Sequence, residues 1–257
     1  MHFFENNRAI KGFKVFSSTQ RLGTGTFILR SDSITHRVPM KVTERAGFNF
    51  GKGGLPMKTA ISINLQIGDT VVAFLNCHLP SGWLEKDAIQ RALRVEQINK
   101  VFELHKTDLV FWAGDFNFRS FYDEKIFDKK ESPEVANKHV ADVNDSPVKE
   151  NRLYTLEEVM KNREEIIKND ELSKFNFNKI ASAYGFHHAK LPQYPSYRIA
   201  KESVNGVPYY NTHRKVSFTD RIFDYVNSHS AREGCSIEIE NDQYYDEFIG
   251  LAVSDHL

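Results

Sequence analysis

The sequence has few cysteines, no surplus of either charge and no long apolar run. Its two cysteines, Cys77 and Cys235, lack CxxC spacing, so neither a zinc site nor a disulfide framework is expected. Both are expected to be buried small hydrophobes in a reducing, cytoplasmic setting. The 34 Lys and Arg residues equal the 34 Asp and Glu residues, which excludes a generalised positive field for holding nucleic acid or an anionic membrane.

The longest apolar stretches, at 70–75 and 109–113, fall far short of the roughly 18 residues that span a bilayer. Glu5 and Arg8 interrupt the N-terminal region, where a secretory signal needs an unbroken apolar segment. Neither a transmembrane segment nor secretion by that route is therefore expected. Transient, peripheral contact with a membrane surface stays open.

Apolar patterns predict strands and helices that alternate along the chain. Residues 59–65 alternate as in a half-buried strand, and the continuous apolar runs at 71–76 and 108–113 predict central strands. A second helix is predicted over 155–168, where Thr155 and Glu158 have the spacing of a capping box. The first and most regular helical pattern covers 86–105, with apolar positions at Ile89, Leu93, Ile98, Val101 and Phe102.

This order of elements favours a mixed-sheet α/β protein, because several strands are joined too closely for parallel crossovers. No internal repeat or Pro-rich linker divides the sequence. A single domain over 1–257 is therefore expected.

Four short segments place polar residues where an apolar strand ends, the usual place for a site in an α/β fold. Taken singly, they have structural explanations: a core histidine, a turn, a surface ion pair and a frayed terminus. Four such segments in one chain are expected to form one site. Their polar residues are His78 in 76–80, Asp115 and Asn117 in 114–119, Asp220 in 218–222, and Asp255 and His256 in 254–256.

The residue types in these segments suit phosphate chemistry. Carboxylate and amide oxygens are ligands that Mg²⁺ accepts, and histidines paired with aspartates can stabilise or protonate phosphoryl oxygens. The set therefore predicts metal-assisted attack of water on a phosphate ester.

In order and local pattern, these segments resemble the inositol polyphosphate 5-phosphatases, a branch of the endonuclease/exonuclease/phosphatase superfamily. The family's Trp-x-Gly-Asp-x-Asn-Tyr-Arg block is similar to 112–119, with Phe118 in place of Tyr, and its Asn-x-His-Leu block is similar to 76–79. Its Pro-Thr-Tyr-Lys block resembles 195–198, its Pro-Ser/Ala-Trp-Cys-Asp-Arg-Ile block resembles 216–222, and its final Ser-Asp-His is unchanged. The resemblance implies a four-layered α/β/β/α sandwich of mixed sheets.

Two positions are open for the family's Asn-Lys-Gly motif, Lys58 and Lys52. Lys58 is preferred, because it leads directly into the strand that precedes His78. Residues 47–52 imitate a P-loop, but the match is one residue short and lacks the Ser or Thr, so a P-loop is rejected.

Family members begin with a strand carrying Trp-Asn and then a Gln-Glu pair whose Glu binds Mg²⁺. No such segments precede residues 13–30, which already resemble the strand pair that follows them. The sequence also stops at Leu257, where the family continues into a last strand. Two alternatives stay open: a fragment of a longer protein, incomplete at both ends, or a degenerate metal site.

The resemblance implies a Mg²⁺-dependent phosphatase that removes the 5-phosphate from a phosphoinositide or a soluble inositol polyphosphate. Asp115 would be the general base, and Asn117 would orient the attacking water and the phosphate. His78 and His256 would hold the phosphoryl oxygens, and Asp220 would fix the tautomer of His256. Positioning and electrostatics carry most of phosphoryl transfer, which fits these roles.

The remaining implied residues bind the metal or the neighbouring phosphates. Asp255 would lie near the metal, and the substrate phosphates would be bound by Lys58, Tyr197 and Arg198, with Arg119 and Arg221 supporting the site. Two rival functions stay open. One is a nuclease or other phosphodiesterase of the same superfamily, which the neutral charge and 195–198 argue against. The other is an inactive homologue or fragment that binds inositol phosphates or a partner, which the missing Glu favours.

Overall fold

The structure is a computed structural model that describes residues 13–21, 24–31, 33, 38–50, 58–123, 126, 153–174, 185–188, 191–199, 209–211 and 215–227. The chain divides into two compact units, and each unit takes in several separate stretches of sequence. The first unit is made from Met1–His78, Gln97–Ala113 and Phe223–Ile237, and the second from Leu79–Glu96, Gly114–Ile222 and Glu238–Leu257. The expectation of a single domain over 1–257 stays a prediction.

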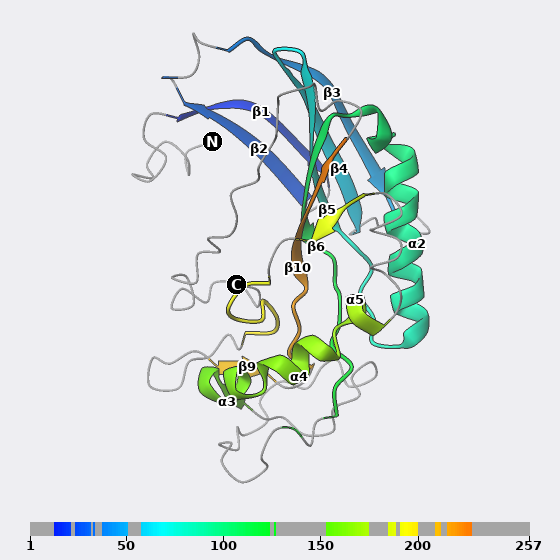
Figure 1. The fold of residues 1–257 in the computed structure, drawn as a ribbon, viewed down its shortest axis with the longest axis vertical. Helices are drawn as coiled ribbons and strands as arrows, with labels where there is room; N and C mark the ends of the chain where they lie inside the picture. Colours follow the sequence, from blue (N-terminus) through cyan, green and yellow to red (C-terminus); the bar gives the residue numbers. More distant parts are fainter. Residues whose placement is uncertain are drawn as a thin grey trace. The chain divides into compact units, whose positions relative to one another are not determined.

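The first unit is built on antiparallel strand pairs (Figure 1). Strand β1 (Phe13–Arg21) pairs with β2 (Thr24–Ser31), as the sequence predicts for residues 13–30. Strand β3 (Met40–Asn49) pairs with β4 (Thr59–Ile67), which pairs in turn with β5 (Thr70–His78). The predicted strands at 59–65 and 71–76 are therefore confirmed.

The sheet continues beyond β5 through two strands whose ends belong to the second unit. The strand order is β3-β4-β5-β6-β10, with β6 at Leu109–Asp115 and β10 at Asp220–Val226. The two-residue strand β8 (His187–His188) follows β10 in the same sheet. Strand β6 confirms the predicted strand at 108–113.

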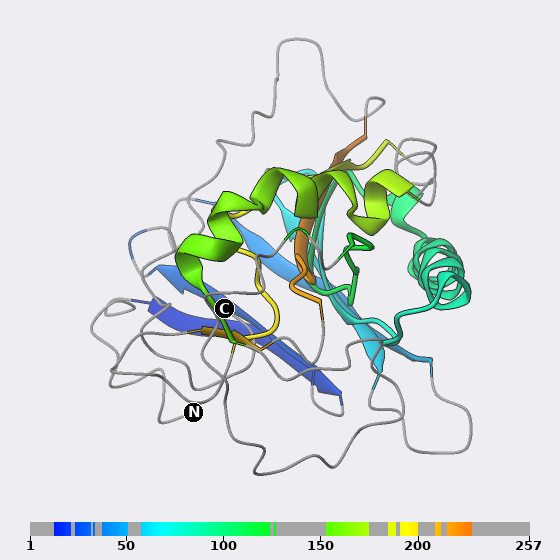
Figure 2. The same cartoon turned by 90° about the horizontal axis from the view of Figure 1, so that it is seen from below.

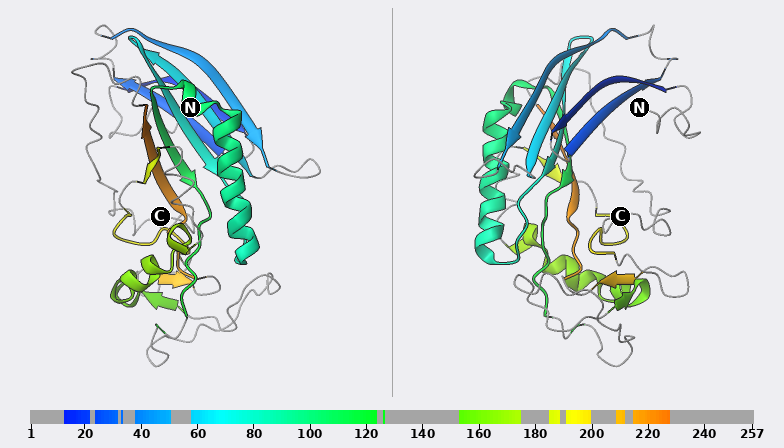
Figure 3. Two further views of the ribbon diagram at one scale, coloured as in Figure 1. Left: turned by 45° about the vertical axis from the view of Figure 1, so that its right-hand side comes forward. Right: turned by 180° about the vertical axis from the view of Figure 1, so that it is seen from behind.

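Strand β4 is buried on both faces, although its alternating sequence predicts that one face is exposed to solvent. Ile61 and Ile63 are at most 1% exposed, and Ser62 between them is 3% exposed. The reason is the β1–β2 pair, which packs against β4 and β5 (Figure 3). The hydroxyl of Thr59 donates to that of Thr24 at 2.8 Å across this contact, so these two buried hydroxyls are paired with each other.

Cys77 on β5 is buried, as predicted, while Cys235 lies outside the described residues. Phe13 and Phe27 on the β1–β2 pair are each 48% exposed. The described part of the chain contains no helix long and apolar enough to cross a membrane.

Helix α2 (Glu85–Val101) confirms the first predicted helix, but its buried face differs from the prediction. Ile89 and Leu93 are about half exposed, at 49% and 50%, whereas Arg91 between them is fully buried. An apolar-periodicity argument assigns charged residues to the surface, so it misses an arginine that has a buried partner. The buried positions of the helix are Ala88, Arg91, Val95, Ile98 and Asn99.

Three short helices follow one another in the second unit (Figure 2): α3 (Leu156–Lys161), α4 (Arg163–Lys168) and α5 (Glu171–Lys174). The predicted single helix over 155–168 is therefore wrong in one respect, because it is interrupted at Asn162. The capping box is confirmed: the Thr155 hydroxyl accepts from the Glu158 amide at 3.1 Å, and the Glu158 carboxylate accepts from the Thr155 amide at 2.7 Å.

The second unit also has its own apolar core. Strand β7 (Leu153–Thr155) pairs antiparallel with β9 (Tyr209–Asn211) beside α3. The core is ring-rich, which agrees with the aromatic content of the sequence, and it consists of Tyr122, Tyr154, Val159, Ile166, Ile199, Tyr210, Val216 and Phe218. The mixed α/β class is thus confirmed, and the four-layered sandwich stays a prediction.

The capping box gives a direct test of local stability. Replacing Thr155 by Ala removes the acceptor for the Glu158 amide, so we expect a loss of about 1 kcal/mol in the free energy of unfolding. Urea denaturation measures it. Thr155→Ser keeps the hydroxyl and should retain most of the stability, and equal stability of wild type and the Ala variant would contradict the assignment.

Candidate functional site

Three of the polar segments contact one another within the second unit. The Phe116 amide donates to the Thr219 carbonyl at 2.8 Å, which joins the 114–119 segment to the 218–222 segment. Tyr197 and Ser217 exchange backbone hydrogen bonds of 3.1 and 2.8 Å, which joins 195–198 to the same strand end. The Leu79 amide donates to the Asp115 carbonyl at 2.9 Å. Segments far apart in sequence therefore converge on the end of β6.

Asp115, the last residue of β6, is held by Asn117. One carboxylate oxygen accepts from the Asn117 backbone amide at 2.8 Å and the other from the Asn117 side-chain amide at 2.9 Å. Asn117 has φ 53, a left-handed conformation that asparagine tolerates better than most residues. Gly114, which precedes Asp115, has φ 142, so the chain turns sharply where the strand ends. The half-buried carboxylate is thereby fixed in one orientation.

The Asn117 side chain uses both of its amide hydrogens inside the protein. Besides the bond to Asp115, its nitrogen donates to the Leu79 carbonyl at 2.9 Å, and its oxygen accepts from the Arg119 guanidinium at 2.6 Å. These contacts make Asn117 an orienting group for Asp115. The 4% exposure of Asn117 agrees with this role.

Arg119 is 1% exposed and lies between two aromatic rings. Its guanidinium carbon is 4.3 Å from the Trp83 ring centroid and 4.7 Å from that of Tyr197. Cation–π attraction of this kind strengthens when the cation is desolvated. Burial therefore favours the supporting role expected for Arg119, and it places the Tyr197 ring in the same packing.

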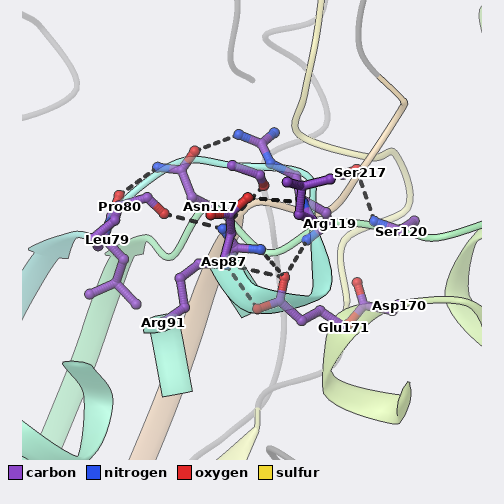
Figure 4. A network of polar contacts seen from close by, with 12 residues as sticks. Leu79, Pro80, Asp87, Arg91, Asn117, Arg119, Ser120, Asp170, Glu171 and Ser217 are labelled. Atoms are coloured by element: carbon purple, nitrogen blue, oxygen red, sulfur yellow. Dashed lines mark hydrogen bonds and ion pairs between the residues drawn. The ribbon is translucent and has the colours of Figure 1, made fainter. Parts of the chain in front are cut away.

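Beneath these loops lies a buried ion pair between Arg91 of α2 and Glu171 of α5 (Figure 4). The two side chains are 0% and 2% exposed, with the closest nitrogen–oxygen distance at 2.6 Å. Burial raises the pKa of the Glu171 carboxyl, and hydrogen bonding and charge attraction from Arg91 oppose that rise. The pairing keeps the buried carboxylate and guanidinium neutralised by each other.

A second buried pair joins Arg221 to Asp170, whose side chains are 1% and 3% exposed. Burial raises the pKa of the Asp170 carboxyl, and the Arg221 charge opposes this. Arg221 also lies 3.2 Å from Nε2 of His188, and burial, with the Arg221 charge second, lowers the pKa of His188 to about 3. Arg221 therefore supports the strand end and is enclosed by protein groups.

Asp220 lies beside a buried serine of the 195–198 segment. The Ser196 hydroxyl accepts from the amides of Thr219 at 3.1 Å and Asp220 at 3.0 Å. The Thr219 hydroxyl donates to the Asp220 carboxylate at 2.9 Å. These bonds fix where Asp220 begins β10. Arg198 next to Tyr197 is half-buried.

In the first unit, Nζ of Lys58 and Nε2 of His78 are in direct contact. Lys58 immediately precedes β4, and His78 ends β5, so antiparallel pairing of these strands brings the two side chains together. The preference for Lys58 over Lys52 stays a prediction, because Lys52 lies outside the described residues together with Asp255 and His256. Among the residues that the structure describes, no group of three or more His, Cys, Asp or Glu side chains could hold a metal ion.

Sequence reasoning missed the groups beneath the site. Arg91 is read as a surface residue of α2, and Asp170 and Glu171 fall after the predicted second helix in a charged stretch. The one available signal is their consecutive position in 170–171, since two adjacent acids at the start of a helical turn can face two buried cations. Only the fold identifies those cations.

Comparison with known proteins assigns the chain to a family. Residues 4–257 match the family model of the Endonuclease/Exonuclease/phosphatase family 2, so the chain belongs to this family. It is similar to the type I inositol polyphosphate 5-phosphatase 8 of Arabidopsis thaliana, with 26% identity over 126 residues, which cover 44% of this chain and 26% of that protein. It also resembles the type IV inositol polyphosphate 5-phosphatase 3 of Arabidopsis thaliana, with 30% identity over 79 residues, covering 26% of this chain and 12% of that protein.

Two solved structures share the fold. One is the inositol polyphosphate 5-phosphatase domain of SPsynaptojanin in complex with inositol (1,4)-bisphosphate and calcium ion, with TM-score 0.53 and 20% identity, covering 83% of this chain and 55% of that one. The other is a Cimex nitrophorin mutant in its ferrous NO complex, with TM-score 0.53 and 12% identity, covering 86% of this chain and 65% of that one. A phosphatase and a nitrophorin on one fold show that function must be argued from the site.

His188 makes stability depend on pH. Its pKa in the folded protein is about 3, below the usual 6.5, so the unfolded chain binds the proton more readily. Its contribution is complete above its usual pKa and is lost as the pH falls toward the folded value. Between about pH 7.5 and pH 5.5 this group should cost about 1.4 kcal/mol in unfolding free energy.

Urea denaturation at both pH values measures this loss. His188→Gln should lose less stability on acidification than wild type by that amount. The matched control is His187→Gln, because His187 is exposed and adjacent, and it should behave as wild type. An acid response unchanged in the His188 variant would show that this histidine carries no such linkage.

Proposed function

We propose that this chain is a phosphatase that hydrolyses the 5-phosphate of an inositol phosphate, carried either on a lipid or on a soluble inositol. The observation that supports it most is the fixed Asp115–Asn117 pair at the end of β6, in a segment whose Phe116 amide donates to Thr219 and whose Arg119 guanidinium packs against the Tyr197 ring. The similarity to inositol polyphosphate 5-phosphatases of Arabidopsis thaliana supports the substrate class. A cytoplasmic enzyme that contacts membranes transiently would meet both kinds of substrate.

In this proposal Asp115 accepts the proton of the attacking water. Both of its oxygens accept from Asn117, which restricts the carboxylate to one orientation. His78 and His256 hold the phosphoryl oxygens, and Asp220 fixes the tautomer of His256.

The neighbouring phosphates need cations. Lys58, in contact with His78, and the half-buried Arg198 are the proposed phosphate-binding groups, together with Tyr197, which precedes Arg198 in the chain. Arg119 and Arg221 are almost fully buried, so we assign them to holding the loops that carry these groups. An exposed guanidinium fork suits bidentate contact with a phosphate.

We further propose Mg²⁺ as the metal. Carboxylate oxygens are the hard donors that Mg²⁺ accepts, Asp255 is the residue expected near the metal, and Mg²⁺ commonly takes one or two carboxylates plus waters and substrate phosphates. When bound, the ion would neutralise charge on the phosphoryl oxygens. The described residues form no complete metal cluster by themselves.

Asp115→Asn tests the general base. The amide keeps the shape of the side chain but cannot accept the water proton, and it keeps only one of the two acceptors for Asn117, so we expect a fall in kcat of at least about 100-fold with a loss of about 1 kcal/mol in the free energy of unfolding. Phosphate release from inositol 1,4,5-trisphosphate and from the corresponding lipid, each with Mg²⁺ and with EDTA, is the measurement. Asp69→Asn, in the exposed turn after β4, is the control and should retain activity.

Each result has a defined meaning. Turnover retained in the Asp115 variant would overturn the base assignment. Activity that EDTA leaves intact would overturn the metal proposal. A folded wild-type chain that releases no phosphate from either substrate would overturn the phosphatase proposal and favour an inactive homologue that binds inositol phosphates.

Arg198→Ala tests the substrate class. Loss of this cation should reduce kcat/KM for inositol 1,4,5-trisphosphate by about 10-fold or more, because a charge-assisted phosphate contact is removed. Hydrolysis of a simple aryl phosphodiester should change little. Lys168→Ala, a change of an exposed lysine, is the control. Equal losses on both substrates would favour the phosphodiesterase alternative.

A further inference from the structure

Arg91 and Glu171 form the most deeply buried ion pair among the described residues, and the proposed chemistry gives it no role. Arg91 is 0% exposed on α2, and Glu171 is 1% exposed at the start of α5. Neither belongs to any of the polar segments that define the site. Burying two charges is costly, and a pair of apolar residues often serves stability equally well. The pair therefore calls for an explanation beyond stability.

The Arg91 guanidinium holds two separate segments. Toward α5 it donates to both Glu171 oxygens, with distances of 2.8 and 3.2 Å from Nε and 2.6 Å from Nη2. Toward the segment after His78 it donates to the carbonyls of Pro80 at 3.3 Å and Gly82 at 3.2 Å. One rigid, planar group thus sets the path of residues 80–82 relative to Glu171.

Glu171 in turn fixes the backbone of the segment that carries Asp115. Its carboxylate accepts from the Arg119 amide at 3.1 Å, and its own amide donates to the Arg119 carbonyl at 2.9 Å. Both polar groups of the Arg119 backbone are therefore bound to one residue. Figure 4 shows these contacts converging on Glu171 from Arg91 and from Arg119.

From Arg119 the contacts continue to the reacting carboxylate. The Arg119 side chain donates to Asn117 at 2.6 Å, and Asn117 donates to both Asp115 and the Leu79 carbonyl. Leu79 belongs to the same segment that Arg91 holds at Pro80 and Gly82. The network is closed, because each side of Asn117 is attached to a segment that Arg91 or Glu171 fixes.

We propose that the Arg91–Glu171 pair is a positioning device that sets the orientation of Asn117 and Asp115 by fixing the Arg119 backbone and the 79–82 segment. This inference rests on the proposed function for its kinetic test. Neither residue touches the substrate, so both are positioning residues. Misplacing a reacting group by about 1 Å can reduce turnover by about 100-fold.

Glu171→Gln is the first test, since it keeps side-chain volume while removing the charge and one of the acceptors. We expect kcat to fall by about 10–100-fold, with KM within about twofold of wild type, because an orienting group affects the transition state more than binding. Glu103→Gln, which breaks an exposed ion pair with Lys106, is the matched control and should keep wild-type kcat. Wild-type kcat in Glu171→Gln would overturn the proposal.

The double variant R91M/E171L separates positioning from stability. Removing both charges avoids the unpaired charge that a single variant leaves, so the melting temperature should recover toward wild type. The kcat should stay low, because the Arg119 amide still lacks its acceptor. Recovery of kcat together with stability would show that the pair is only structural. The double variant also serves if Glu171→Gln does not fold.

A measurement without substrate keeps this proposal separate from the proposed function. The side-chain amide of Asn117 and the backbone amide of Arg119 should shift in the NMR spectrum of Glu171→Gln, while Glu103→Gln leaves them in place. Unmoved resonances would overturn the positioning role even in an active enzyme. Shifted resonances in a chain that releases no phosphate would support positioning while the phosphatase proposal fails.

Discussion

The second unit depends on the need to neutralise guanidinium groups that are removed from water. Arg91, Arg119 and Arg221 are each at most 1% exposed, and desolvating each ion costs several kcal/mol unless it is paired and hydrogen-bonded. Glu171 pairs with Arg91, and Asp170 pairs with Arg221. Arg119 contacts Asn117 and two aromatic rings. Because Asp170 and Glu171 are adjacent, one turn of chain carries the anions for two cations from distant segments.

This arrangement explains why loops can present a reactive group accurately. Asp115 is the last residue of β6 and Asn117 lies in the loop after it, so strand pairing alone does not fix the orientation of their side chains. Buried charge pairs are directional and intolerant of partial separation, since separation leaves a desolvated charge unpaired. The apolar core around Phe218 supplies stability, and the charge network supplies orientation.

Much of the fold is predictable from sequence, because the strands and the α3 capping box depend on local patterns. The site is predictable only in part. The 114–119, 195–198 and 218–222 segments are recognisable by residue type, and the fold brings them together. The catalytic roles of these residues stay predictions, as do those of Asp255 and His256. The burial of Arg91 and Glu171 is not predictable from the sequence, because a buried ion pair leaves no periodic pattern. Either residue alone would be assigned to the surface. The helix interruption at Asn162 is not predictable either, because asparagine is only mildly unfavourable within a helix.

Asn117 illustrates how two unrelated requirements can reduce the choice of residue at one position to a single type. Its left-handed backbone admits glycine, asparagine and aspartate most easily. Of these, glycine offers no side chain, and aspartate would set a second anion against Asp115 and remove both amide donors. Backbone conformation and hydrogen-bond polarity are thus independent requirements, and asparagine is the residue that meets both. Every substitution at this position therefore disturbs the left-handed backbone, the hydrogen bonds to Asp115, or both.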